Sequence, residues 1–421
     1  MGESVLGVGA FSGSNGEEAA VPPSGAAASR QKPDFRSREF LLGHIRHTLS
    51  FYDPRAVDPN GGFYHCFMND GTVFDAELRT LVASCRFVFN YAKAYRQFGD
   101  PGYLSRVGHG IDFLRRAHRH PQSGGYAWRL RGGRVEDGTN HCYGLAFVLL
   151  AYACALDAGV DAAGDWIGET FELMERRFWL PEHGLYASES DAGWKLSPYR
   201  GQNDNMHACE AMIAAYEATH ETRYLDRACL IAESIAHRAV AGADGYILEH
   251  YRTDWTVDHE YARGDQSNPM RPWGVQTGHQ TEWAKLLFEL EQHRPQAWRL
   301  PRARQLFDRS VEHGWDAEHG GLIHAFALDG AACDRDKYFW VQAESIAAAA
   351  VLGAWTGEEK YWAWYDWIWD YAYRSFVDHE YGAWYRILTP DNRRYDERKS
   401  YNNKADYHTM GACHEALRVI R

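Results

Sequence analysis

The sequence lacks the features of membrane-spanning, disulfide-stabilised and nucleic-acid-binding proteins. No apolar run is long enough to cross a bilayer. The eight cysteines form no C-x-x-C pair, which favours buried reduced thiols over a disulfide framework. The net charge of -12 offers no basic field for phosphate backbones or anionic lipids. We expect a cytoplasmic protein, monomeric or homodimeric, that binds a small neutral ligand and neither nucleic acid nor membrane.

The N-terminal segment also lacks targeting features. Its first 33 residues consist largely of Gly, Ala, Ser and Pro, with no basic start and no long apolar stretch. Such a composition cannot bury enough apolar surface to order itself and does not match a signal peptide. We predict a disordered tail over 1–33 and a single catalytic domain over 34–421.

A short glycine-centred turn, in contrast, recurs six times. The turns lie at Gly62, Gly125, Gly184, Gly245, Gly321 and Gly382. The spacing is about 60 residues, apart from a longer gap of about 76 residues between Gly245 and Gly321. A fixed period of this length indicates a repeated helical hairpin, and six copies suggest a closed ring.

Helical periodicity flanks every turn. Before the turns, amphipathic patterns predict outer helices at 36–52, 102–119, 165–179, 222–240, 297–315 and 358–377. After the turns, more apolar patterns predict inner helices at 77–98, 140–157, 203–220, 276–292, 339–355 and 405–419. The predicted fold is all-α, an (α/α)6 barrel with short β-hairpins at one rim.

The inner helices of such a ring all run in the same sense, so their N-terminal ends meet at one mouth. Polar and aromatic side chains occupy the first turns of these otherwise apolar helices, a pattern typical of a ligand pocket. The candidate site residues are Arg86, Tyr143, Asn203, His207, His279, Glu282, Trp340, Glu344 and His408.

Three of these residues are histidines on three different inner helices, which favours proton transfer over packing. A histidine near its ordinary pKa takes and returns protons at neutral pH and contributes roughly 10² to 10⁴ in rate. Removal of the C2 proton from an open-chain aldose leaves an enediolate that needs fixed positive charge, for which Arg86 is the candidate.

Other residues of the mouth are expected to hold a sugar. Trp340 would stack on a pyranose face while Gln342 and Glu344 bind hydroxyls, and Asn203 would cap its helix and bind a further hydroxyl. Metal binding is the competing interpretation of the H-x-x-E spacings at His279 and His207, because each spacing can place both side chains on one helix face. That pattern is short and common, so no metal and no other cofactor is predicted.

The long gap in the repeat holds about 15 extra residues within 249–272, directly before His279. An insertion beside the mouth suggests a lid or specificity loop; an inert surface loop is the alternative.

Four strings in order give a resemblance to a known family. They are Tyr199–His207 (YRGQNDNMH), Gly278–Trp283 (GHQTEW), Phe339–Glu344 (FWVQAE) and Lys404–His408 (KADYH). The chain resembles the N-acylglucosamine 2-epimerase superfamily over about 36–421, within which Asn140–Phe147 (NHCYGLAF) is most similar to the mannose isomerase branch. Many relatives have a histidine before the Ala-Phe of that string, where this chain has Leu145.

The resemblance implies an (α/α)6 barrel and places the family's acid/base pair on His279 and His408. It places sugar contacts on His207, Trp340, Glu282 and Glu344, and the enediolate contact on Arg86. It implies a metal-independent isomerase that interconverts D-mannose and D-fructose, in which His408 moves the C2 proton to C1 and His279 assists ring opening and protonates an oxygen.

Three alternatives stay open. A 2-epimerase acting on mannose and glucose, N-acylglucosamine or cellobiose would use the same two histidines from opposite faces. A glycoside hydrolase would recruit Glu282 and Glu344 as separated carboxylates. A non-enzymatic sugar-binding protein is the third.

Overall fold

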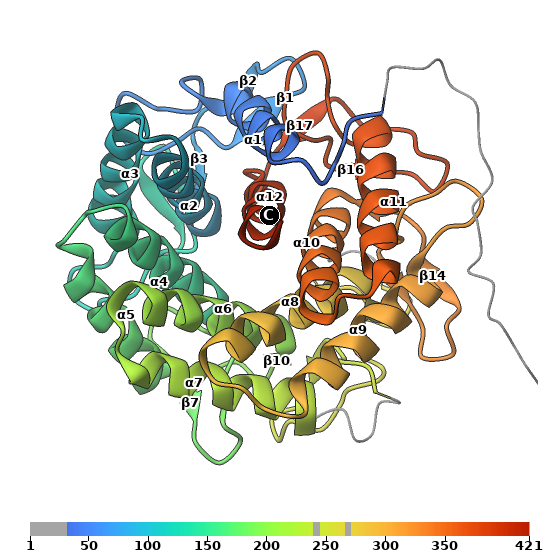
Figure 1. Ribbon diagram of the computed structural model, residues 1–421. Helices are drawn as coiled ribbons and strands as arrows, with labels where there is room; N and C mark the ends of the chain where they lie inside the picture. Colours follow the sequence, from blue (N-terminus) through green and yellow to red (C-terminus); the bar gives the residue numbers. More distant parts are fainter. Residues whose placement is uncertain (1–31, 239–244, 266–270, 421) are drawn as a thin grey trace, which may run out of the picture. The chain divides into compact units, whose positions relative to one another are not determined.

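Two concentric sets of helices alternate along the chain (Figure 1). The computed structural model describes residues 32–238, 245–265 and 271–420, within which there are twelve α-helices. The outer helices are α1 (Arg38–Tyr52), α3 (Pro101–Phe113), α5 (Ala163–Arg177), α7 (Thr222–Ala232), α9 (Arg299–Gly314) and α11 (Glu359–Ser375). The inner helices are α2 (Leu81–Phe98), α4 (Cys142–Asp157), α6 (Gln202–Thr219), α8 (Thr277–His293), α10 (Phe339–Thr356) and α12 (Tyr407–Val419).

The difference between the two sets follows from their sequences. Helices α4 and α10 are apolar on nearly every face and are buried over almost their whole length. Outer helices such as α9 bury one stripe, including Leu306 and Phe307, and leave a charged face exposed. Short π-helical turns, η1 (Leu114–His118) and η2 (Glu233–Arg238), continue α3 and α7.

Short antiparallel strands form the connections between outer and inner helices. They are β1 (Cys66–Met68), β2 (Val73–Asp75), β3 (Leu78–Thr80), β4 (Arg129–Arg131), β5 (Arg134–Asp137), β6 (Asn140–His141), β7 (Trp179–Leu180), β8 (Leu185–Tyr186), β9 (Glu189–Ser190), β10 (Arg200–Gly201), β11 (His250–Tyr251), β12 (Val275–Gln276), β13 (Ala325–Phe326), β14 (Ala332–Asp334), β15 (Lys337–Tyr338), β16 (Ile387–Leu388) and β17 (Arg398–Ser400). Most inner helices follow directly on a strand, which fixes where each begins.

A buried ion pair braces three of the glycine turns in the same way. An aspartate at the start of the turn bonds a basic residue placed 21 positions later in the strand before the next inner helix. The pairs are Asp58 with Arg79 at 2.5 Å, Asp316 with Lys337 at 2.7 Å and Asp378 with Lys399 at 2.5 Å. Because both partners are buried, removing either would leave an uncompensated charge.

Amide side chains on inner helices provide a second repeated brace. Each amide accepts a hydrogen bond from the backbone N–H and donates one to the backbone C=O of a single residue beyond a glycine turn. The pairs are Asn205 with Tyr186, Gln280 with Ile247 and Gln342 with Leu322. These contacts satisfy buried backbone groups and fix the height of α6, α8 and α10 in the ring.

The first and last repeats join to close the ring. Strand β17 pairs with β1, and α12 packs against both α1 and α2. Tyr52 at the end of α1 donates a hydrogen bond to Asp406 before α12 at 2.5 Å. The predicted all-α (α/α)6 barrel with small β-hairpins is confirmed.

Some expectations lie outside the described residues. All of the predicted tail except residues 32 and 33 is among them, as are parts of the fourth glycine turn and of the 249–272 insertion. The compact unit Pro33–Arg421 holds all the described helices. Among the described residues, none of these helices combines the length and apolar character needed to cross a membrane.

Candidate active site

The N-terminal ends of the inner helices surround a cavity of about 160 Å³. All six inner helices contribute to its wall, as do the strand segments that precede α8, α10 and α12. The lining residues are Arg86, Tyr143, Asn203, His207, Gln276, His279, Glu282, His324, Tyr338, Phe339, Trp340, Arg386, Ile387, Tyr401, Asn402, Asn403, Lys404 and His408.

The structure brings together eight of the nine predicted site residues, and Glu344 is the exception. Glu344 does not line the cavity but lies behind His408, where it bonds His408 and Lys285. Gln342 is likewise absent from the cavity wall because its amide is engaged by Leu322. Neither side chain of this pair therefore supports the expected contact with sugar hydroxyls: Glu344 shares the helix face of Trp340 but lies one turn deeper, behind His408, and Gln342 points toward the backbone of Leu322.

His408 is held as a neutral base. Its Nδ1 lies 2.6 Å from Oε1 of Glu344, so Nδ1 carries the proton and donates it to the carboxylate. Nε2 lies 3.3 Å from Nη2 of Arg86, a donor, so Nε2 presents a lone pair. Burial, with a smaller contribution from the charge of Arg86, lowers the pKa of His408 to about 4 against the opposing hydrogen bond to Glu344.

His279 is held through the same ring nitrogen by a different carboxylate. Its Nδ1 lies 2.9 Å from Oε2 of Glu249, which leaves Nε2 for a ligand. The imidazole packs on Trp340 with ring centroids 4.9 Å apart. Gly278 permits this contact because a Cβ there would lie 2.3 Å from the Trp340 ring.

Arg86 reaches the cavity from the second turn of α2. Its guanidinium donates to the Asn403 carbonyl at 2.8 Å and to the Tyr143 hydroxyl at 3.1 Å, and it packs over the Phe147 ring. Those contacts hold a fixed positive charge beside Nε2 of His408.

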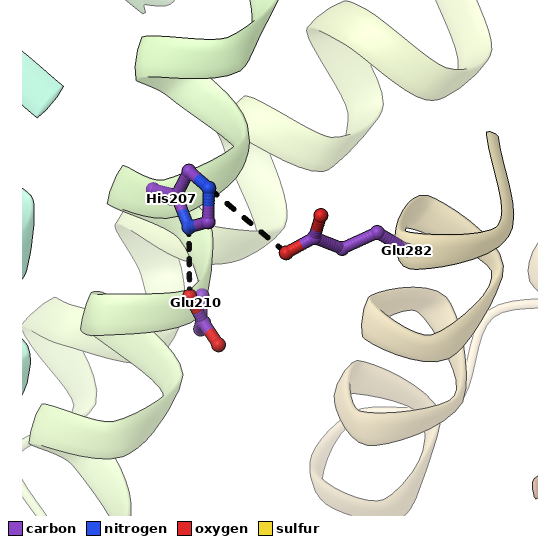
Figure 2. Close-up of side chains that lie close together, drawn as sticks. All are labelled: His207, Glu210 and Glu282. Carbon is purple, nitrogen blue, oxygen red and sulfur yellow. Dashed lines mark hydrogen bonds and ion pairs between the residues drawn. The ribbon is translucent and has the colours of Figure 1, made fainter. Parts of the chain in front are cut away.

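His207 and Glu282 face each other across the cavity (Figure 2). Nδ1 of His207 lies 2.9 Å from Glu210, and Nε2 lies 4.0 Å from Glu282. Both carboxyl oxygens of Glu282 are buried and, among the described residues, have no hydrogen-bond partner. Burial, then repulsion from Glu344, raises the pKa of Glu282 well above its ordinary value. The two oxygens of Glu282 are therefore available to a ligand.

Within the described part of the chain, two groups of side chains bring possible metal-ligand atoms close together. They are His207 with Glu210 and Glu282, and Glu282 with Glu344 and His408. Glu210 already accepts from His207 and Tyr407, and Glu344 accepts from His408 and Lys285. In each group Glu282 alone offers oxygens without a protein partner among the described residues.

Lys285 places a buried cation beneath these carboxylates. Its Nζ donates to Oε2 of Glu344 at 2.7 Å, one turn along α8 from Glu282. Burial opposes ionisation of Glu344, yet Lys285 and His408 together hold its pKa at about 2. Glu344 is thus an anion shared between a lysine and His408.

Asn203 lines the cavity but does not cap α6, contrary to expectation. Gly201 occupies the N-cap position, and the Oδ1 atom of Asn203 is buried without a hydrogen-bond partner in the described part of the chain. The amide is therefore free to contact a ligand hydroxyl.

Sequence reasoning missed several residues of the site. His324 and Tyr338 stack at 4.0 Å on its wall, and both belong to segments between helices, where no helical period marks orientation. Lys285 and Glu249 lie behind the histidines rather than on the wall.

The start of the insertion is tied to the site. Strand β11 pairs with β10 immediately before α6, and the backbone N–H of Gln202 bonds the Glu249 carbonyl at 3.1 Å. This pairing places the Glu249 side chain behind His279.

Comparison with known proteins agrees with the arrangement. The sequence pattern of the N-acylglucosamine 2-epimerase family matches residues 62–412. The chain belongs to this family. A family relative described as D-mannose isomerase, from Marinomonas mediterranea, is 49% identical over 92% of this chain and 99% of its own length.

Solved structures of family members show the same fold. A crystal structure of D-mannose isomerase matches with a TM-score of 0.91 and 48% identity, covering 92% of this chain and 100% of that one. A cellobiose 2-epimerase from Spirochaeta thermophila matches with a TM-score of 0.81 and 24% identity, covering 91% and 96%. The latter likeness concerns the fold alone.

Proposed function

We propose that this family member is a metal-independent aldose–ketose isomerase that interconverts D-mannose and D-fructose through a cis-enediolate. The observation that carries the proposal is the pair of histidines on one cavity, each fixed through Nδ1 by a carboxylate, with Arg86 beside Nε2 of His408. The D-mannose isomerase relative at 49% identity supports the choice of reaction.

In the proposed reaction, neutral His408 takes the C2 proton of the open-chain aldose while protonated His279 gives a proton to O1. The C2–H bond breaks, C1 and C2 become doubly bonded, and the carbonyl becomes a hydroxyl. His408 then returns its proton to C1 while His279 takes the proton of O2, which leaves the C2 carbonyl of the ketose. Two protons move and no redox partner is required.

The remaining wall residues hold and polarise the substrate. Arg86 lies beside His408 and would stabilise negative charge developing on O1 and O2. Tyr143, Asn203, His207 and Glu282 would bind hydroxyls, and Trp340 would cover the apolar face of the sugar. The eight free cysteines support a reducing, cytoplasmic location. A monomer or homodimer stays our expectation for the assembly.

The glycoside hydrolase alternative loses support. It would need Glu282 and Glu344 on opposite sides of a glycosidic bond. Glu344 bonds Lys285 and His408 and does not line the cavity.

Product analysis tests the proposal directly. Purified protein incubated with D-mannose, with and without EDTA, should yield fructose at equal rates in an NMR assay. Glucose as the product would replace the isomerase with a 2-epimerase, loss of turnover in EDTA would refute metal independence, and binding without turnover would indicate a sugar-binding protein.

A further inference from the structure

The two histidines differ in what neutralises the carboxylate behind them. Glu344, behind His408, shares its charge with Lys285, whose Nζ lies 2.7 Å from Oε2. Glu249, behind His279, has a neutral partner in Gln202, whose Nε2 lies 2.9 Å from Oε2. The other oxygen of Glu249 is buried and has no hydrogen-bond partner in the described ranges.

The orientation of Gln202 is fixed. The indole N–H of Trp283 donates to Oε1 of Gln202 at 2.7 Å, so the amide nitrogen must point to Glu249. Burial opposes ionisation of Glu249, but the contacts with His279 and then Gln202 outweigh it and leave the Glu249 pKa below its ordinary value. The carboxylate is therefore an anion held against Nδ1 of His279.

We propose that Glu249 and Lys285, neither of which contacts the cavity, are positioning residues that divide the labour between the histidines. Glu249 stabilises the imidazolium form of His279, the acid of the reaction. Lys285 draws the charge of Glu344 away from His408 and leaves it neutral, the base of the reaction. This inference rests on the proposed isomerase function. It adds two residues to the site: Glu249, the first residue of the insertion, and Lys285, which lies behind the cavity.

Other titratable groups also lie near His279. Those that line the cavity with it are Arg86, His207, Glu282, His324, Arg386, Lys404 and His408, and His250, the first residue of β11, follows Glu249. Among the described residues, Glu249 is the one carboxylate within hydrogen-bond distance of His279. Glu249 is therefore the carboxylate that bonds directly to that ring.

The pH profile of kcat separates this role from a merely structural one. Activity needs neutral His408, which sets the acid limb, and protonated His279, which sets the basic limb. Glu249→Gln keeps an acceptor for Nδ1–H but removes the charge, so the basic limb should move to lower pH by about one unit or more while the acid limb stays. Glu249→Asp retains the charge and should keep the basic limb near its wild-type position.

Lys285→Met should move the acid limb of the pH profile of kcat. Without the lysine, the Glu344–His408 pair takes up a proton at higher pH, and Nε2 of His408 loses its free lone pair whichever member holds the proton. The acid limb should rise by about one unit. Matched controls are Glu260→Gln, an exposed carboxylate of the same insertion, and Lys360→Met on the outer face, neither of which should move a limb.

The experiment measures fructose formation from D-mannose between pH 4 and 10 in wild type and variants. Opposite movement of the two limbs supports the proposal. Movement of the acid limb in Glu249→Gln would mean that the histidines have exchanged roles, and unmoved limbs with reduced kcat would mean that both residues only support the fold. A wild type that forms no fructose would instead refute the proposed function.

Discussion

At the scale of single residues, the site depends on where charges are neutralised. Nε2 of His408 carries a lone pair because Glu344 holds the proton on Nδ1, and the Arg86 guanidinium lies beside that nitrogen as a donor. Arg86 itself is fixed by the Asn403 carbonyl and the Tyr143 hydroxyl. Three directed donors from one planar group are required, which a lysine cannot provide.

Replacement of Arg86 by lysine tests this requirement. Arg86→Lys keeps the positive charge but loses the directed N–H donors of the guanidinium group. The kcat for mannose isomerisation should therefore fall by about 10²-fold, with a smaller change in KM. Arg134→Lys, at an exposed position in β5, is the matched control and should leave both constants unchanged. A variant with wild-type kcat would show that geometry at this position is unimportant.

At the scale of elements, the amide braces set the height of the inner helices. Gln342 in α10 accepts from the backbone N–H of Leu322 at 2.9 Å and donates to its carbonyl at 2.7 Å, all within the core. The same helix carries Trp340 and Glu344, so the brace also positions the site.

Loss of this brace should destabilise the barrel. Gln342→Leu leaves two buried backbone groups of Leu322 without partners, and the free energy of unfolding should fall by about 2 kcal/mol or more. Urea denaturation of this variant beside Gln122→Leu, at an exposed loop position, measures the difference. Equal midpoints for the two variants would argue against the brace.

Much of the helix arrangement and of the cavity lining could be predicted from the sequence. The helical period and the glycine turns located all twelve helices within a few residues when η1 and η2 are counted with α3 and α7, because amphipathic and fully apolar patterns differ clearly between outer and inner positions. The first turns of the inner helices identified eight residues that line the cavity. Glu344 was misplaced, and Glu249 and Lys285 were missed, because periodicity gives a helix face but not which neighbour satisfies a buried charge.

At the scale of the whole molecule, burial keeps many histidines neutral. Burial lowers the pKa of His44 and His414 to about 3 and of His118 and His408 to about 4, and it takes that of His65 well below its ordinary value. Burial acts in the opposite sense on three carboxyl groups: it raises the pKa of Asp204 to about 6 and of Glu289 to about 8, and it takes that of Glu282 well above its ordinary value.

These shifts predict an acid-sensitive fold. A histidine with a lowered folded pKa contributes stability above its unfolded value of about 6.5 that is lost as the pH falls. The three carboxyl groups have the opposite effect, because a raised folded pKa adds stability as the pH falls. The five histidines outnumber them. The urea midpoint should therefore decrease from pH 7 to pH 5, with net proton uptake on unfolding; an unchanged or higher midpoint at pH 5 would contradict this balance.

The central claim is that His408 removes the C2 proton. It is tested most directly with D-[2-²H]mannose, by NMR detection of loss of deuterium from C2, in wild type, His408→Asn and the exposed control His237→Asn. We predict that C2 cleavage proceeds in wild type and the control and falls by about 10²-fold or more in His408→Asn, because the lone pair at Nε2 is lost. Deuterium loss from C2 at near wild-type rate in His408→Asn would contradict the mechanism.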